Sequence, residues 1–180
     1  MTIYTIGHST RPADEFARIL RAYGIELLAD IRTVPRSRKN PQYDQEEFKR
    51  LLAKERITYR HLAGLGGLRH ARKDSLNTAW KNASFRGYAD YMQTPEFTRA
   101  LEELIALAAE QTTAIMCAEA VPWRCHRSLV ADALLVRGIR VADIIASSPP
   151  REHKLTSFAR VRGVKITYPA GQSGVPSVAR

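Results

Sequence analysis

The segment "MCAEAVPWRCHRS", Met116–Ser128, concentrates the reactive side chains of this sequence. Its thirteen residues include both cysteines of the chain, together with Glu119, His126 and two arginines. Such a cluster is typical of three kinds of site: a thiol nucleophile, a metal site, or a polar turn that joins a strand to a helix. The cluster taken by itself leaves all three open.

The thiol hypothesis makes Cys117 the nucleophile, because it follows a predicted buried strand and precedes a predicted helix. A helix N-terminus and nearby cations, here Arg124 and Arg127, favour the thiolate form of a cysteine. Backbone N–H groups of the loop could also hold an anion. The spacing departs from the cysteine phosphatase signature, because six residues, not five, separate Cys117 from Arg124.

The metal hypothesis uses Cys117, Cys125 and His126, with His8 or Glu119 as a further ligand. Structural zinc sites usually contain two closely spaced pairs of ligands, and this sequence has no C-x-x-C pair. Cys125 and His126 are adjacent, and adjacent side chains on a helix point about 100° apart. We therefore expect no bound metal and no other cofactor, and we place a metal-dependent hydrolase last among the alternatives.

The structural hypothesis treats both cysteines as small buried hydrophobic side chains. Arg127 then pairs with Glu119 or Asp30 across the loop, because a fully paired buried network can fix a strand–helix turn without any chemistry. Two cysteines in a chain of this length do not form a disulfide framework, so the cytoplasm is the expected location.

Polar residues also follow two other predicted strands. Gly7-His8-Ser9 comes after the first strand, while Asp30 and Arg32 close the second. In a parallel α/β sheet, ligands bind beyond the carboxyl ends of the strands, so these residues should share one pocket with the cysteine segment. The alternative for Asp30 and Arg32 is an internal ion pair. The loop after Arg32 is rich in basic residues, which suits contact with phosphate.

These strand ends define the predicted site. The expected catalytic residues are Cys117, Glu119, Asp30, His8 and His126. The residues expected to bind the substrate anion are Gly7, Ser9, Arg32, Arg36, Arg124 and Arg127.

The order of hydrophobic segments predicts an α/β domain. Strands are expected at 3–6, 25–31, 113–117 and 139–145, and helices are expected to follow Thr10, Thr94 and Ser128. Gly24 and Gly138 stand where left-handed caps would end two of the helices. Alternation of strand and helix is the signature of a parallel sheet covered on both faces. We predict an open, mainly parallel Rossmann-like sheet of about four core strands, with helices on both faces and a helical and loop elaboration.

The domain boundaries follow from the same pattern. Residues 1–148 are predicted to be a single α/β domain, in which residues 35–92 elaborate the carboxyl-terminal rim of the strands. This elaboration contains a short strand and several aromatic residues that either stack on bases or pack in the core: Trp80, Phe85, Tyr88 and Tyr91. Residues 149–180 are expected to be a basic segment whose last residues are flexible.

The amino-acid composition indicates which kind of molecule the protein binds. Lys and Arg total 28 against 18 Asp and Glu, and the net charge of +10 favours an anionic small molecule or nucleic acid. A hydrophobic content of 44% is that of a globular protein. No apolar run approaches the roughly 18 residues of a membrane span, so we expect no membrane partner. The sequence gives no indication of the oligomeric state.

Several segments together resemble the family called domain of unknown function 488. They are "TIGHS" at 5–9, "DIRTVPRS" at 30–37, "LGG" at 65–67, "GYADYM" at 87–92 and "CAEAVPWRCHRSLVAD" at 117–132. Six residues match the family pattern C-x-E-x-x-P-x-x-C-H-R position by position: Cys117, Glu119, Pro122, Cys125, His126 and Arg127. The resemblance implies an α/β fold over most of the chain, and the family has no established reaction.

The leading functional hypothesis is an enzyme that acts on a phosphate-bearing substrate, either a nucleotide or a nucleic acid. Its arginines hold the anion, the carboxylate of Glu119 or Asp30 transfers a proton, and Cys117 is the nucleophile. The first alternative is a non-catalytic nucleic-acid-binding module in which the Cys-His-Arg cluster only braces the fold.

Overall fold

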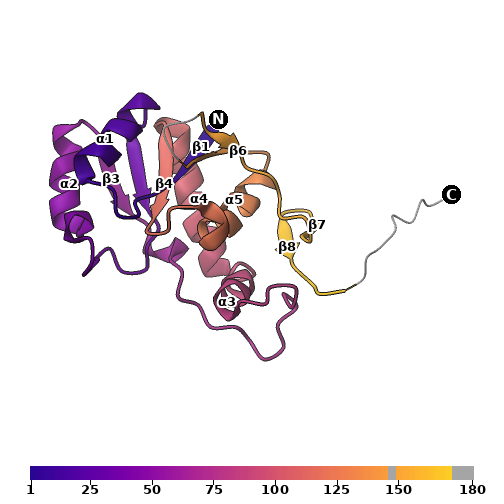
Figure 1. Ribbon diagram of the computed structural model, residues 1–180. Coiled ribbons are helices and arrows are strands. Elements are labelled where there is room, and N and C mark those ends of the chain that lie inside the picture. The colour runs from indigo at the N-terminus through magenta and orange to yellow at the C-terminus, as the bar shows by residue number, and fades with distance from the viewer. Residues whose placement is uncertain (146–148, 172–180) are drawn as a thin grey trace.

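A six-stranded, mostly parallel sheet forms the centre of the protein (Figure 1). The computed structural model describes residues 1–145 and 149–171. The strand order is β3-β2-β4-β1-β5-β6, in which the first five strands are parallel and β6 runs antiparallel to β5. The strands are β1 (Thr2–Gly7), β2 (Leu27–Asp30), β3 (Thr58–His61), β4 (Thr113–Cys117), β5 (Arg140–Ile144) and β6 (Arg151–Glu152), and a separate antiparallel hairpin contains β7 (Arg160–Arg162) and β8 (Lys165–Thr167).

Helices cover both faces of the sheet. The α-helices are α1 (Ala13–Ala22), α2 (Gln45–Lys54), α3 (Ala83–Tyr91), α4 (Pro95–Glu110) and α5 (Arg127–Leu135), and short 3₁₀ helices are η1 (Pro41–Tyr43), η2 (Ala63–Leu65) and η3 (Pro122–Arg124). Figure 1 shows α1 and α2 on one side of the sheet and α4 and α5 on the other. The hydrophobic core is divided in the same way, with α1 and α2 in one cluster and α3, α4 and α5 in the other. No helix within residues 1–145 and 149–171 is long and apolar enough to cross a membrane.

The predicted α/β fold with a mainly parallel sheet is confirmed. All residues of β2 and β4 are buried, as expected for strands that are covered on both faces. The sheet has six strands where about four core strands were predicted, because β3 and β6 extend its two edges. The strand β3 has the sequence TYRH and buries only Tyr59, so its hydrophobic signal is weak. It is the short strand predicted within the elaboration of residues 35–92, and the structure places it in the central sheet beside β2.

The ends of the first helix differ in part from the prediction. Helix α1 begins at Ala13 with Pro12 as its cap, and Thr10 lies outside it. Gly24 has a φ of +64°, which is the left-handed conformation predicted for the helix end. Glycine adopts this conformation without the steric cost that a Cβ would bring.

The segment after residue 148 contributes to the packing of the domain. Strand β6 joins the sheet, and Tyr168, which follows β8, is completely buried against Trp80 and Phe158. Tyr88 is buried as well and packs on Phe97, while Trp80, Phe85 and Tyr91 are partly buried and pack against the same core. The predicted flexible end falls in residues 172–180, outside the described residues.

The connections of β1 and β4 leave the sheet in opposite directions. These two strands are neighbours in the sheet. The chain passes from β1 to α1 on one face and from β4 to α5 on the other. In open α/β sheets, the crevice at such a divergence is where ligands bind. The fold therefore places Gly7-His8-Ser9 beside Cys117 and Glu119 at the most favourable position for a site.

A buried charge cluster fixes the last part of the chain to the sheet. His153 lies between two buried carboxylates, with ring nitrogens 3.1 Å from Asp132 Oδ1 and 3.0 Å from Asp143 Oδ2. Thr5 and Tyr168 donate hydroxyl hydrogen bonds to the same two carboxylates. Burial acts to lower the pKa of His153, but the hydrogen bonds and charges of the two carboxylates outweigh it and raise the pKa to about 9.

This cluster predicts a loss of stability at alkaline pH. Because the folded-state pKa of His153 lies above the ordinary value of 6.5, its contribution is fully present below about pH 6.5 and is lost as the pH rises toward 9. The difference corresponds to roughly 3 kcal/mol in the free energy of unfolding. Urea unfolding at several pH values measures it. In His153→Gln the fall across this pH range should disappear, and an equal fall in both proteins would contradict the assignment.

Candidate functional site

A cavity of about 430 Å³ opens at the carboxyl-terminal ends of β1, β2 and β4. Six of the residues predicted for the site line it: His8, Arg32, Arg36, Cys117, Glu119 and His126. The loop after β2, Gly67, Leu68 and Cys125 complete the wall. A larger hollow of about 720 Å³ beside α1 and α2 contains none of the predicted site residues.

Gly7 and Ser9 lie behind the wall of the cavity and join two strand ends. A side chain at Gly7 would overlap the backbone of Glu119 and would lie 2.9 Å from the guanidinium of Arg127. The backbone N–H groups of His8 and Ser9 donate to carbonyl oxygens at the end of β4, at distances of 3.0 and 2.9 Å. These backbone groups therefore bond to the protein, and the position of Gly7 requires glycine for close packing.

His8 presents a nitrogen that the protein leaves free. Its Nδ1 lies 2.8 Å from the carbonyl oxygen of Ser9, so Nδ1 carries the hydrogen, and the ring stacks on Tyr43 with centroids 4.1 Å apart. Nε2 is buried and has no partner among the described residues. Burial lowers the pKa of His8 to about 4, and the positive charges of Arg32 and Arg127 act in the same direction. His8 is therefore neutral at pH 7, with Nε2 as an acceptor.

Asp30 and Arg32 form a buried ion pair. Arg32 Nη2 lies 2.6 Å from Asp30 Oδ2, Nε lies 3.0 Å from Oδ1, and Tyr59 donates its hydroxyl to Oδ2 at 2.6 Å. Burial acts to lower the pKa of Arg32, but Asp30 outweighs it, and the net pKa is raised. Arg32 Nη1 is buried without a partner among the described residues. The carboxylate of Asp30 thus holds Arg32 in place while one guanidinium nitrogen stays available.

Arg127 is a fully buried cation beside a sulfur atom. Its side chain has no exposed surface, and Nη1 donates to Cys117 Sγ at 3.3 Å while Nη2 donates to Ala120 O at 3.5 Å. The expected ion pair of Arg127 with Glu119 or Asp30 is wrong: no ion pair of Arg127 occurs in the described part of the chain. Burial lowers its pKa to about 10, so it remains charged at pH 7.

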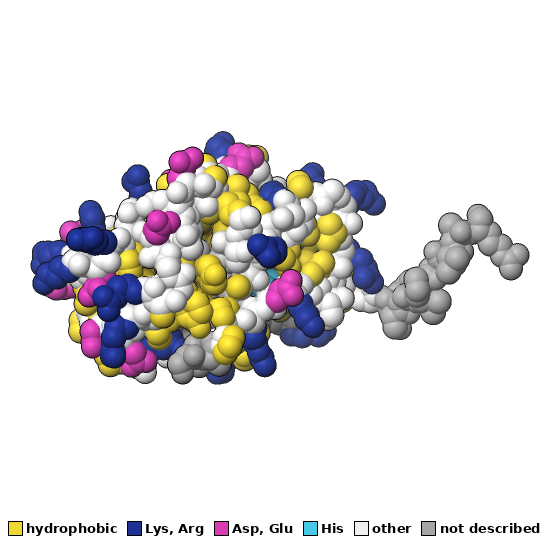
Figure 2. Space-filling view, turned by 90° about the horizontal axis from the view of Figure 1, so that it is seen from above, with side chains coloured by type: hydrophobic (Ala, Val, Ile, Leu, Met, Phe, Trp, Pro, Cys, Tyr) yellow, Lys and Arg dark blue, Asp and Glu magenta, His cyan; other side chains and the backbone are white. Residues whose placement is uncertain are grey.

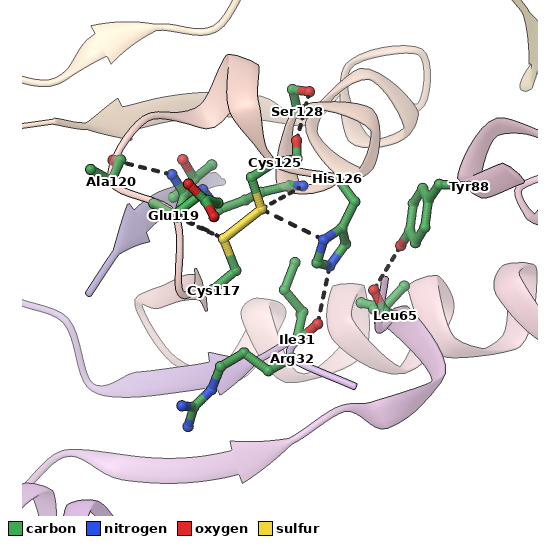
Figure 3. Close-up of a disulfide and its surroundings, with 12 residues drawn as sticks. Ile31, Arg32, Leu65, Tyr88, Cys117, Glu119, Ala120, Cys125, His126 and Ser128 are labelled. Carbon is green, nitrogen blue, oxygen red and sulfur yellow. Dashed lines mark hydrogen bonds between the residues drawn. A yellow bond between two sulfur atoms is a disulfide. The ribbon is translucent and has the colours of Figure 1, made fainter. Parts of the chain in front are cut away.

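The two cysteines are joined to each other across the loop that contains η3 (Figure 3). Both lie at the cavity wall, with exposed fractions of 3% for Cys117 and 5% for Cys125. The backbone N–H of Arg127 donates to Cys125 Sγ at 3.4 Å. The sequence did not predict this pairing, because a spacing of eight residues is no signature of a disulfide.

His126 lies between the second cysteine and the neighbouring strand. Its Nε2 lies 3.1 Å from Ile31 O, so Nε2 carries the hydrogen, while Nδ1 lies 3.6 Å from Cys125 Sγ (Figure 3). Burial lowers the pKa of His126 to about 4, and the charges of Arg127 and Arg69 act in the same direction. The ring is neutral at pH 7, and Nδ1 is placed to accept a hydrogen bond from a thiol at Cys125.

The remaining predicted residues are exposed. Glu119 and Arg36 are exposed and line the cavity. Arg124 is exposed at the end of η3 and does not line the cavity. In Figure 3 the Arg32 side chain extends away from the sulfur atoms. The guanidinium of Arg32 and the two sulfur atoms therefore lie in different parts of the cavity lining, and His8 lies beside Cys117 on the neighbouring strand end.

The structure adds residues that the sequence did not indicate. Tyr59 and Tyr43 position Asp30 and His8, and Val34 and Leu68 line the cavity with exposed fractions of 59% and 80%. Tyr59 lies on β3, which we assigned to the elaboration. Its contact with Asp30 was therefore not predicted. No sequence signal marked Leu68. Its φ of +55° is visible only in the structure.

The described residues contain no group of three or more His, Cys, Asp or Glu side chains arranged to hold a metal ion. Cys117 and Cys125, which the metal hypothesis used as ligands, are bonded to each other. The structure thus offers no observation in support of a metal-dependent hydrolase.

Comparison with protein families gives one match. The model for "Domain of unknown function DUF488" matches residues 12–134. The chain belongs to the DUF488 family. The DUF488 match covers β2, β4 and most of α5, while His8 on the loop after β1 precedes it. Neither the curated proteins nor the solved structures give a match.

The buried ion pair predicts that Asp30 is needed for stability. Asp30→Asn leaves the Arg32 charge buried without its carboxylate, so the free energy of unfolding should fall by about 3–5 kcal/mol in urea titrations. Asp14→Asn is the matched control, because Asp14 pairs with Arg18 on an exposed helix face and should change stability by less than about 0.5 kcal/mol. Equal losses in the two variants would show that the pair does not stabilise the fold.

Proposed function

We propose that this cavity is the active site of an enzyme that acts on a small phosphate-bearing substrate, with reduced Cys117 as the nucleophile. The observation that carries the proposal is the buried guanidinium of Arg127. It has no carboxylate partner in the described residues, and its Nη1 donates to Cys117 Sγ at 3.3 Å. A buried charge without a partner is costly, and a thiolate at Cys117 would supply the missing negative charge.

Two further residues of the cavity lining support the choice of a phosphate-bearing substrate. Arg32 Nη1 and His8 Nε2 both belong to residues that line the cavity, and both atoms are buried without partners among the described residues. A guanidinium N–H donates well to a phosphate oxygen, and a neutral imidazole nitrogen accepts from a phosphate or ribose hydroxyl. Arg36 adds a second positive charge to the cavity lining.

The chemistry assigned to the cysteine is a displacement. The Cys117 thiolate attacks the phosphorus atom, the leaving oxygen departs with a proton, and water then releases phosphate from sulfur. We assign acid–base chemistry at the cavity to Glu119, since Asp30 is occupied by Arg32 and Tyr59. Asp30 accordingly serves as a positioning residue for Arg32.

The test is steady-state hydrolysis of an aryl phosphate and of nucleoside monophosphates by the reduced protein. Cys117→Ser should lower kcat by at least about 100-fold with little change in KM, because the nucleophile is lost while the side chains that bind the phosphate remain. Arg36→Gln should raise KM, whereas Arg99→Gln, an equal charge change on exposed α4, should not. Turnover that survives Cys117→Ser, or no turnover of any phosphate ester, would contradict the proposal.

The exposed hairpin of β7 and β8 favours nucleic-acid binding as a second candidate function. Arg160, Arg162 and Lys165 are exposed on it, and Ile166 is buried and anchors it to the domain. Figure 1 places the hairpin on the side away from α1 and α2, and Figure 2 shows further Lys and Arg side chains around the edge of another face. Basic side chains at a surface can follow a phosphate backbone.

This second candidate predicts steeply salt-dependent binding of a short single-stranded oligonucleotide, measured by fluorescence anisotropy. Replacing Arg160 and Arg162 together by Gln should reduce the slope of log affinity against log salt by about 1.4, because two contacts to single-stranded phosphate are lost. Cys117→Ser should bind as the wild type does. Absence of binding at low salt, or an unchanged slope, would exclude the hairpin as the binding surface.

A further inference from the structure

The cysteine pair is almost completely buried and lines the cavity. Cys117 and Cys125 are the two cysteines of the chain, and they are bonded across the loop between β4 and α5. Their exposed fractions are only 3% and 5%. Another protein cannot reach sulfur atoms that are this well covered. A reagent for either sulfur must be small enough to enter a cavity of about 430 Å³.

The surroundings of the two sulfur atoms differ in kind. Cys117 Sγ accepts from the buried, permanently charged guanidinium of Arg127, and this favours its thiolate when the pair is reduced. Cys125 Sγ accepts only a backbone N–H at the start of α5 and faces the neutral His126 Nδ1 at 3.6 Å. Reduced Cys125 can therefore stay protonated, with its S–H donating a hydrogen bond to His126 Nδ1. Cys117 is therefore suited to attack the substrate, and Cys125 is suited to attack the oxidised Cys117 afterwards.

We propose that the Cys117–Cys125 pair reduces small hydroperoxides, with Cys117 as the attacking thiolate and Cys125 as the thiol that resolves the product. The inference shares with the proposed function only the thiolate at Cys117, and it requires no phosphate-bearing substrate. Enclosure favours a small peroxide over a protein disulfide as the oxidant, and a disulfide between Cys117 and Cys125 would be the oxidised product of this reaction.

The steps balance. The Cys117 thiolate attacks the terminal oxygen of the hydroperoxide, so that an S–O bond forms and the O–O bond breaks. Sulfur is oxidised to a sulfenic acid, and the peroxide is reduced to an alkoxide that takes a proton from water and leaves as alcohol. Cys125, whose S–H donates a hydrogen bond to His126 Nδ1, then attacks Cys117 Sγ, and its proton passes to the departing oxygen. The disulfide forms, and hydroxide leaves with that proton as water. Two equivalents of a small thiol restore both cysteines.

The experiment treats the reduced full-length protein with limiting hydrogen peroxide at about pH 7 and follows free thiols and intact mass. The wild type should lose both thiols together, with a mass decrease of two hydrogens and a Cys117–Cys125 bond in the peptide map. Cys125→Ser should stop at a sulfenic acid on Cys117, which dimedone traps, and Cys117→Ser should keep its Cys125 thiol. The wild type should react up to about 30-fold faster than free cysteine, whose thiol is only about 3% ionised at this pH.

A matched variant separates the two steps. His126→Gln should leave the first oxidation unchanged and slow closure of the disulfide, so that sulfenic acid accumulates before it disappears. Reaction of the wild type no faster than that of free cysteine, or loss of the Cys125 thiol in Cys117→Ser at the wild-type rate, would overturn the inference. Because this assay contains no phosphate ester, its failure is distinguishable from failure of phosphate-ester hydrolysis by the same reduced protein.

Discussion

The buried guanidinium of Arg127 is the constraint around which the strand ends are arranged. It has no exposed surface, it makes no ion pair within the described residues, and its Nη1 donates to Cys117 Sγ. Gly7 has no side chain, and one would crowd both this guanidinium and the backbone after β4. Such a charge is costly to bury, so the fold must gain from the position of Arg127. We infer that Arg127 is placed there to stabilise an anionic sulfur at Cys117.

The topology explains why the reactive groups meet. The chain leaves β1 and β4 toward opposite faces of the sheet, and the crevice between these strands receives His8 from one side and the cysteines from the other. Arg32 reaches the same cavity from β2 because Asp30 and Tyr59 hold its guanidinium. One cavity thus combines cationic side chains with the two cysteines. This combination fits both a bound phosphate and a reactive thiolate.

Much of this arrangement could be predicted from the sequence, because hydrophobic periodicity defines strands and helices and parallel strands end at one edge. The α/β fold, the four strands β1, β2, β4 and β5, and the convergence of residues from three strand ends follow from these rules. The contacts of individual side chains cannot be predicted from these rules, because they join segments that are far apart in the sequence. Arg127 was expected to meet a carboxylate and instead lies on Cys117. Tyr59 was hidden in a short edge strand.

The central claim is that Arg127 holds reduced Cys117 as a thiolate, and ultraviolet absorbance of the thiolate tests it most directly. In reduced Cys125→Ser, where Cys117 is the remaining thiol, most of the signal should already be present at about pH 7, and Arg127→Lys should keep more of it than Arg127→Met. An ordinary thiol is only a few per cent ionised at this pH. A signal of that size in Cys125→Ser would contradict the account.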